Sequence, residues 1–159
     1  RPTQQPHPPI LIGARGKRPF RRIAEYCDGW VPADNSAKPE VMERIDKEWG
    51  EINSLWKEYG REGNPSLIVA PAFRQLTTKT EGAGETVVKA VVKEGEQNYI
   101  TTYPMTHVDE MTRQIRSYGD IGAEMVVVHL PSFRYGEFDN KGMLLNQMEL
   151  LAEHVMPKI

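Results

Sequence analysis

The sequence predicts an α/β protein built on a parallel sheet. Strand-like apolar runs and helix-like segments alternate four times along the 159 residues. The strand-like runs are continuously apolar, which is typical of strands buried on both faces in a parallel sheet. No long run alternates between apolar and polar residues, so the pattern does not favour a meander or a sandwich. Repeated strand–helix units of this kind indicate a sheet covered by helices.

The first unit begins after a polar lead-in. Four prolines among residues 1–9 predict an extended surface segment. Ile10-Leu11-Ile12 predicts the first strand, and Pro19 suits the first turn of the helix that follows. The second strand is expected from Asp28 to Pro32, with Asp28 fixing a turn at its start. The first helix has three apolar positions: Phe20, Ile23 and Ala24.

A long amphipathic helix is predicted from about Pro39 to Tyr59, because apolar residues recur there at helical spacing. Its apolar stripe consists of Val41, Ile45, Trp49, Ile52 and Trp56. Its opposite, charged face carries Glu43, Arg44, Lys47, Glu48 and Glu51. Gly60 and Gly63 end this helix, and Leu67–Ala70 predicts the third strand.

Residues 75–104 form an insert of less regular pattern. The valine-rich segment Val87–Val92 is interpreted as a short helix. Its β-branched content and the nearby glycines leave a hairpin as the alternative.

The carboxyl-terminal part of the chain completes the pattern. Thr106 is expected to cap a helix, and Met125–Leu130 predicts the fourth strand. The buried stripe of the helix after Thr106 is Val108, Met111, Ile115 and Tyr118. A last helix is expected to bury Leu144, Met148, Leu151 and Val155. We expect residues 1–159 to form one domain. A complete eight-unit (β/α)8 barrel takes about 250 residues, so four units correspond to half of one.

Composition narrows the class of function. A net charge of −2 argues against a general nucleic-acid or membrane-surface binder, and no apolar run approaches the roughly 20 residues of a membrane span. No signal peptide is visible. The lone cysteine, Cys27, is interpreted as a buried structural thiol, and the cytoplasm is the expected location.

The segment Gly13-Ala14-Arg15-Gly16-Lys17 lies between the first strand and the first helix. Main-chain N–H groups at a helix N-terminus carry partial positive charge, and glycine lets an anion approach them closely. The segment therefore predicts a phosphate-binding turn. The alternative is a tight turn whose cations are simply solvated.

Three segments, Gln5–Gly13, Ala24–Pro32 and Ile121–Val128, resemble the bacterial luciferase-like monooxygenase superfamily. The resemblance implies a (β/α)8 TIM barrel that uses FMN or the deazaflavin coenzyme F-420. This chain would supply its last four units, the fifth to eighth strands, and the missing amino-terminal half would be a partner. The Pro-His-Pro-Pro and Asp-Gly-Trp segments favour F-420.

In that superfamily, the turn after the fifth strand helps to bind the cofactor's phosphate. Carried onto this chain, the role falls on Gly13, Ala14, Arg15, Gly16 and Lys17. The superfamily often has a pair of glycines at this turn, whereas Ala14 and Arg15 follow Gly13 here.

Further candidates lie where other predicted strands end. Trp30 ends the second strand and either lines the cofactor pocket or fills the core. Arg74, His129 and Arg134 are candidates for a substrate pocket, although His129 also suits a core position. No His and carboxylate pair has metal-ligand spacing, so we expect no metal site. No nucleophile–base set is present, and an enzyme whose cofactor performs the chemistry does not need one.

The resemblance thus implies an oxidoreductase or monooxygenase that acts on a small molecule. Two alternatives remain open at this stage. One is a non-catalytic half-barrel that binds a phosphate-bearing ligand, and the other is a generic α/β sugar-phosphate enzyme. Since a four-stranded sheet leaves two open edges, a homo-oligomer is also expected.

Overall fold

The computed structural model describes residues 3–33, 38–71, 75–80, 86–94, 97–129 and 141–159. It divides into two compact units. The first comprises Arg1–Pro71 and Tyr118–Val127, and the second comprises Ala72–Ser117 and Val128–Ile159. That residues 1–159 form one domain stays a prediction.

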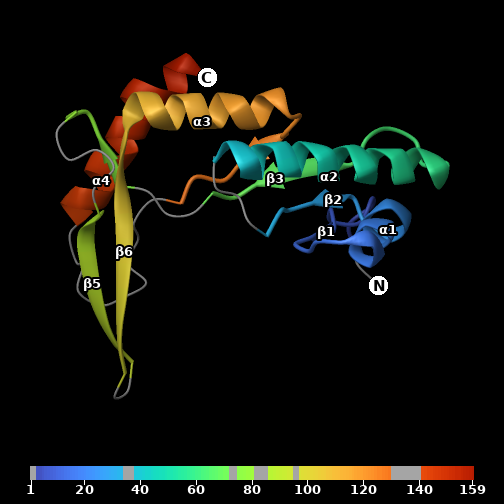
Figure 1. The fold of residues 1–159 in the computed structure, drawn as a ribbon, viewed down its shortest axis with the longest axis horizontal. Coiled ribbons are helices and arrows are strands. Elements are labelled where there is room, and N and C mark those ends of the chain that lie inside the picture. Colours follow the sequence, from blue (N-terminus) through green and yellow to red (C-terminus); the bar gives the residue numbers. More distant parts are fainter. Residues whose placement is uncertain (1–2, 34–37, 72–74, 81–85, 95–96, 130–140) are drawn as a thin grey trace. The chain divides into compact units, whose positions relative to one another are not determined.

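The first unit contains a four-stranded parallel sheet in the order β1-β2-β3-β7, which confirms the predicted α/β class. Figure 1 labels the first three of these strands. Its strands are β1 (Leu11–Ile12), β2 (Gly29–Trp30), β3 (Ser66–Val69) and β7 (Met125–Val126). All four predicted strands are present, and three are shorter than predicted. β3 has the predicted length, one residue earlier in the chain.

Burial on both faces, predicted for every strand, is correct for β2, whose Gly29 and Trp30 are both buried. In β3, buried and partly buried residues alternate. Leu67 and Val69 of β3 are fully buried. Ile10 beside β1 is 50% exposed and Met125 in β7 is 54% exposed. The physical reason is position in the sheet, because β1 and β7 each pair with one neighbouring strand among the described residues.

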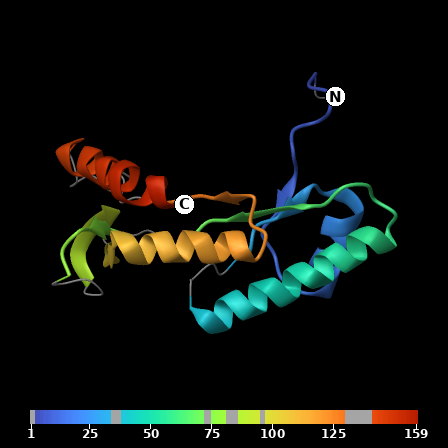
Figure 2. The same ribbon diagram turned by 90° about the horizontal axis from the view of Figure 1, so that it is seen from above.

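Two predicted helices of the first unit are confirmed. Helix α1 (Lys17–Tyr26) buries its three predicted apolar residues. Helix α2 (Pro39–Glu58) is one uninterrupted helix, drawn cyan to green in Figure 2. Four members of its apolar stripe are buried and Trp49 is partly buried. The two helices and the sheet share one core cluster: Phe20, Ile23, Trp30, Val41, Ile45, Ile52, Leu67, Val69 and Tyr118.

Arg61 fastens the carboxyl end of α1 to the end of α2. Its guanidinium lies 3.6 Å from the centre of the Trp56 ring. The guanidinium donates hydrogen bonds to the main-chain carbonyls of Ala24 and Cys27. It also lies 3.8 Å from a carboxylate oxygen of Asp28. The carbonyls at the carboxyl end of a helix have no N–H donor within the helix, and Arg61 supplies that donor at the end of α1.

Cys27 is the buried thiol that the sequence predicts, whereas Asp28 bonds to a distant segment of the chain and not within the predicted local turn. The Cys27 side chain is buried, and burial is the main cause that raises the pKa of its thiol. The Asp28 carboxylate accepts a hydrogen bond from the Ile10 N–H at 2.7 Å. Asp28 therefore fixes the chain at the start of the strands, and the Gly13–Gly16 turn follows the end of β1.

The second unit contains a three-stranded sheet in the order β4-β6-β5. Its strands are β4 (Gln75–Thr77), β5 (Thr86–Glu94) and β6 (Gln97–His107). β6 is parallel to β4 and antiparallel to β5. The helix predicted over Val87–Val92 is therefore wrong, and the hairpin alternative is correct. β-branched residues lose side-chain freedom in a helix and suit a paired strand, which explains the outcome.

A cap at Thr106 predicts that the next helix begins at residue 107, but helix α3 (Val108–Asp120) begins one residue later. Thr106 lies inside β6, opposite Leu76. His107 occupies the cap position instead, and its Nδ1 accepts a hydrogen bond from the Asp109 N–H at 3.3 Å. The cap prediction is therefore wrong, because strand pairing extends through Thr106.

The last helical segment is α4 (Lys141–Leu150), followed by the π-helical turn Leu151–Val155 and the 3-10 turn Met156–Lys158. The predicted burial of Met148 is wrong, since Met148 is 52% exposed. Gln147 is buried in its place. Its side-chain amide accepts a hydrogen bond from the Leu76 N–H and donates one to the Leu76 carbonyl at 3.1 Å.

The Gln147 amide thus pairs with β4 as a neighbouring strand would. Apolar residues occur on all sides of α4, so their spacing does not define which face is buried. The need to satisfy the strand's main-chain groups decides it. Among the described residues, no helix is long and apolar enough to cross a membrane.

We predict that Gly29→Ala destabilises the first unit by about 3 kcal/mol, because overpacking against main chain forces strands apart. A Cβ at Gly29 would lie 2.2 Å from the Ser66 carbonyl oxygen. All three tryptophans lie in the first unit, so urea unfolding followed by tryptophan fluorescence measures the loss. Gly13→Ala is the control, since its Cβ would meet ordinary contact at 3.5 Å. An unchanged midpoint for Gly29→Ala would contradict the observed strand spacing.

We predict that Gln147→Met destabilises the second unit by about 2–4 kcal/mol, because two buried main-chain groups of Leu76 lose their partners. Hydrogen exchange of the β4 amides measures this locally. Gln114→Met is the matched control, since the Gln114 amide bonds only to the partly buried Glu110 side chain at 3.0 Å. Equal effects of the two substitutions would show that Gln147 has no special role.

Candidate functional site

The turn from Gly13 to Gly16 connects β1 to α1. Because all four strands of this sheet are parallel, the turn lies at the edge where their carboxyl ends meet, the usual place for ligands in α/β proteins. Gly16 has φ 102° and occupies the N-cap position of α1. Residues with a Cβ rarely adopt that φ, so the turn requires glycine at this position.

The first residues of α1 supply main-chain donors. N–H groups in the first turn of a helix have no intrahelical acceptor. The first N–H to close a turn here belongs to Phe20, which donates to the Gly16 carbonyl at 3.0 Å. Pro19 has no N–H, and Gly16 provides no side-chain cap. Lys17 and Arg18 therefore carry the N–H groups that a bound anion would satisfy.

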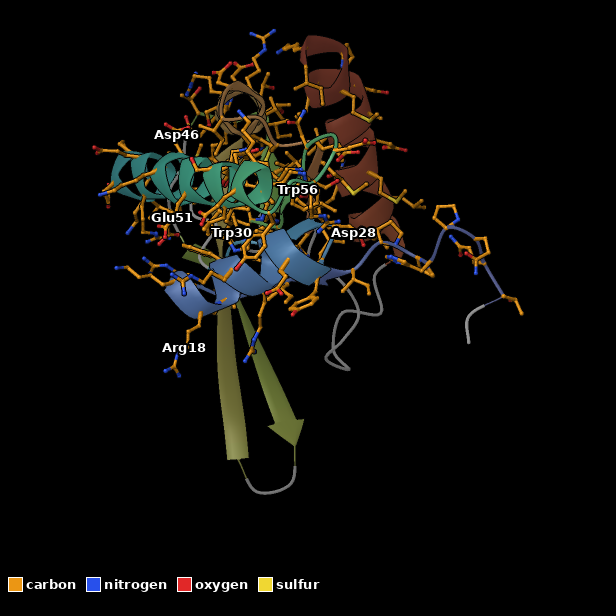
Figure 3. The ribbon with its side chains drawn as sticks, turned by 90° about the vertical axis from the view of Figure 1, so that its right-hand side faces the viewer. Arg18, Asp28, Trp30, Asp46, Glu51 and Trp56 are labelled. Carbon is orange, nitrogen blue, oxygen red and sulfur yellow. The ribbon has the colours of Figure 1, made fainter. Side chains whose placement is uncertain are left out.

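The charge around this helix start is strongly positive. Four exposed cations lie on α1, and no acidic residue occupies its first turn. They are Lys17, Arg18, Arg21 and Arg22. Figure 3 shows Arg18 directed away from the helix. Cations are unfavourable at the positive end of the helix dipole, and like charges four residues apart repel each other. A bound anion would relieve both effects.

Trp30 holds the turn from inside the core. Its side chain is fully buried. Its indole N–H donates to the Ala14 carbonyl at 2.8 Å. The ring meets Phe20 of α1 edge-on at 5.6 Å and stacks on Trp49 of α2 at 6.5 Å, so it lies between the two helices (Figure 3). Its position matches the core alternative, and a direct role in cofactor binding stays a prediction.

The Arg15 side chain is directed to α2. Its Nε and Nη2 both donate to Glu48 Oε1, at 3.0 and 2.8 Å. The sequence places Glu48 on a charged outer face, which is wrong for this residue because its side chain is only 15% exposed. The helical spacing of residues could not predict that Glu48 is covered, because its partner Arg15 lies 33 residues earlier in the chain.

The described structure does not place the other predicted site residues relative to this turn. His129 is partly buried, lies three residues beyond the end of β7 and belongs to the second unit. Arg74 and Arg134 lie outside the described residues. Their roles, and that of His129, stay predictions. In the part of the chain that the structure describes, no group of three His, Cys, Asp or Glu side chains could hold a metal ion.

The residues at the turn fit a phosphate group. The main-chain donors of Lys17 and Arg18, the glycine at Gly16 and the surrounding cations are the features that bind phosphate at helix N-termini. A phosphate-bearing cofactor could therefore be held here.

Comparison with known sequences gives partial matches. No protein-family model matches the chain. Three uncharacterised proteins, one from Mycobacterium bovis and two from strains of Mycobacterium tuberculosis, are each 32% identical to it over 65 residues. Those residues are 40% of this chain and 21% of each mycobacterial protein.

Comparison with solved structures shows the fold. The chain is similar to the coenzyme F420-dependent tetrahydromethanopterin reductase from Methanopyrus kandleri, with a TM-score of 0.60 and 15% sequence identity. The match covers 94% of this chain and 50% of the reductase chain. The chain therefore spans about half the length of this structural neighbour, and it shares the fold of that part.

We predict that Gly16→Ala destabilises the first unit by about 1–3 kcal/mol, because a residue with a Cβ is strained at positive φ. Gly50→Ala is the matched control. Neither Cβ would have a neighbour within 4 Å, but Gly50 lies inside α2 at an ordinary φ. Gly50→Ala should stabilise the protein by about 0.5–1 kcal/mol. Urea unfolding monitored by tryptophan fluorescence compares the two, and changes of the same sign would contradict the assigned turn geometry.

Proposed function

We propose that this chain is the carboxyl-terminal half of a luciferase-like oxidoreductase and that its Gly13–Lys17 turn binds the phosphate of FMN or coenzyme F-420. The observation that carries the proposal is the start of α1. There, a turn that depends on glycine leads into two N–H groups without intrahelical acceptors on the exposed Lys17 and Arg18, with two further exposed arginines one helical turn later and no acid in the first helical turn.

The comparisons support the kind of enzyme proposed. The reductase, half of whose chain matches this fold, is a coenzyme F420-dependent enzyme. The sequence segments that resemble the luciferase-like superfamily lead to the same cofactor class independently of that fold match. F-420 is therefore our first choice and FMN the second. Monooxygenation is proposed only for the FMN case.

Several residues in and around the turn have proposed roles. The main chain of Lys17 and Arg18 binds the phosphate, and Gly16 lets it approach. Trp30 keeps the turn in place through Ala14. The bound flavin or deazaflavin ring would supply hydride chemistry, while the protein binds and orients it.

The open edges of the sheet support a partner that completes it. Ile10 is 50% exposed beside β1, and Met125 and Val127 are 54% and 37% exposed at β7. Apolar side chains along unpaired strand edges favour further strand pairing. We propose that the amino-terminal half of the barrel covers these edges and that a small-molecule substrate binds in the completed barrel. A homo-oligomer through the same edges is the alternative.

The proposal predicts that the chain binds F-420 or FMN and that inorganic phosphate competes. Fluorescence titration of each cofactor, with and without phosphate, measures this. Lys17→Glu should weaken binding by about tenfold or more, because an anion then faces a carboxylate in place of an ammonium.

Lys57→Glu is the matched control, since Lys57 is an exposed lysine in the last turn of α2. It should leave binding unchanged. Equal loss in both variants would indicate a net-charge effect and contradict the assigned site. Preference for a phosphosugar over both cofactors would favour the generic sugar-phosphate enzyme. Binding without any catalysed redox reaction in the completed barrel would favour the non-catalytic alternative.

A further inference from the structure

Two neighbouring residues of α2 hold two neighbouring residues of the turn. Trp49 stacks on Trp30, whose indole N–H bonds to the Ala14 carbonyl. Glu48, the residue before Trp49, accepts two hydrogen bonds from Arg15. Helix α2 thus supports the turn in two ways. Its Glu48 binds the Arg15 side chain directly, and its Trp49 packs against the Trp30 ring that binds the Ala14 main chain.

Glu48 is a mostly buried carboxylate that depends on Arg15. Its Oε1 accepts from Nε and Nη2 of Arg15, and its Oε2 has no hydrogen-bond partner among the described residues. Arg44 also lies near this carboxylate, with 3.8 Å between its Nε and Oε2. A mostly buried carboxylate without a partner is costly, so removal of Arg15 would leave Glu48 with that cost.

We infer that Glu48 is a positioning residue for the Gly13–Gly16 turn, which it holds in shape through Arg15. The inference rests on the proposed anion site at this turn. Arg15 then links the turn to α2 through its hydrogen bonds to Glu48. The anion is bound by the main chain at the start of α1 and by the cations beside it, and the Arg15 charge is largely balanced by Glu48.

The test compares anion binding by Glu48→Gln, Arg15→Gln and the double variant, with F-420, FMN and inorganic phosphate as probes. Each single variant should weaken binding by about tenfold, and the double variant should be no weaker than either, because both changes break one coupled pair. Glu51→Gln is the control, since Glu51 is exposed on the same helix. It should bind as the wild-type chain does.

Opposite results would overturn the inference. If Arg15 were a direct anion ligand held back by a competing carboxylate, Glu48→Gln would bind the probes more tightly. Unchanged binding in Glu48→Gln would overturn it as well. Arg15→Lys provides a second test that retains the charge but loses the two-nitrogen contact with Oε1. If Arg15 positions the turn, Arg15→Lys should weaken anion binding about as much as Arg15→Gln does. If the Arg15 charge binds the anion directly, Arg15→Lys should bind nearly as the wild-type chain does.

Hydrogen exchange of residues 13–17 without any ligand provides a readout independent of binding. Glu48→Gln should increase exchange at the turn, and Glu51→Gln should not. If the wild-type chain binds none of the probes, the proposed function fails, while the exchange experiment still decides whether Glu48 positions the turn. If Glu48→Gln does not fold, as judged by circular dichroism, Arg15→Lys is used for the same comparison.

Discussion

The buried indole of Trp30 is the interaction on which the first unit depends. Trp30 ends β2, in register with Ile12 on one side and Leu67 on the other. The same ring contacts both covering helices, and its N–H holds the Ala14 carbonyl. Sheet, helices and turn therefore share one side chain. If the turn binds the proposed anion, its tie to the core would lower the conformational entropy lost on binding.

The first helix connects stability with binding. Lys17 and Arg18 lie at the positive end of the helix dipole, and each lies four residues before another arginine; both effects disfavour the folded state by a few tenths of a kcal/mol for each interaction. The anion that we propose at the helix start would remove that penalty and would also stabilise the folded protein by mass action. The arrangement that disfavours the free helix is therefore the arrangement that suits a phosphate ligand. Arg15 adds little to this repulsion among cations, because its charge is paired with that of Glu48.

Errors of the sequence-based predictions share a cause, which is pairing between residues distant in the chain. Valines in β5 have a local preference compatible with either state, and pairing with β6 decides it. Thr106 resembles a cap in its local sequence, but β4 extends the ladder through it. Gln147 is buried because it satisfies Leu76, 71 residues earlier. Glu48 is covered because Arg15 reaches it from the turn. None of these partners can be inferred from a helical or strand period.

The sequence by itself determined the α/β class, the four strands of the parallel sheet, the positions of α1 and α2, the buried state of Cys27 and the location of the glycine turn. These features follow from local periodicity, from proline and glycine conformations and from burial of apolar side chains. Only the tertiary structure decided which side chains hold that turn, that the turn needs a positive φ at Gly16, and which strands form the edges of the sheet. The reason is physical: hydrogen-bond partners and neighbours across a sheet are set by how distant segments meet in space.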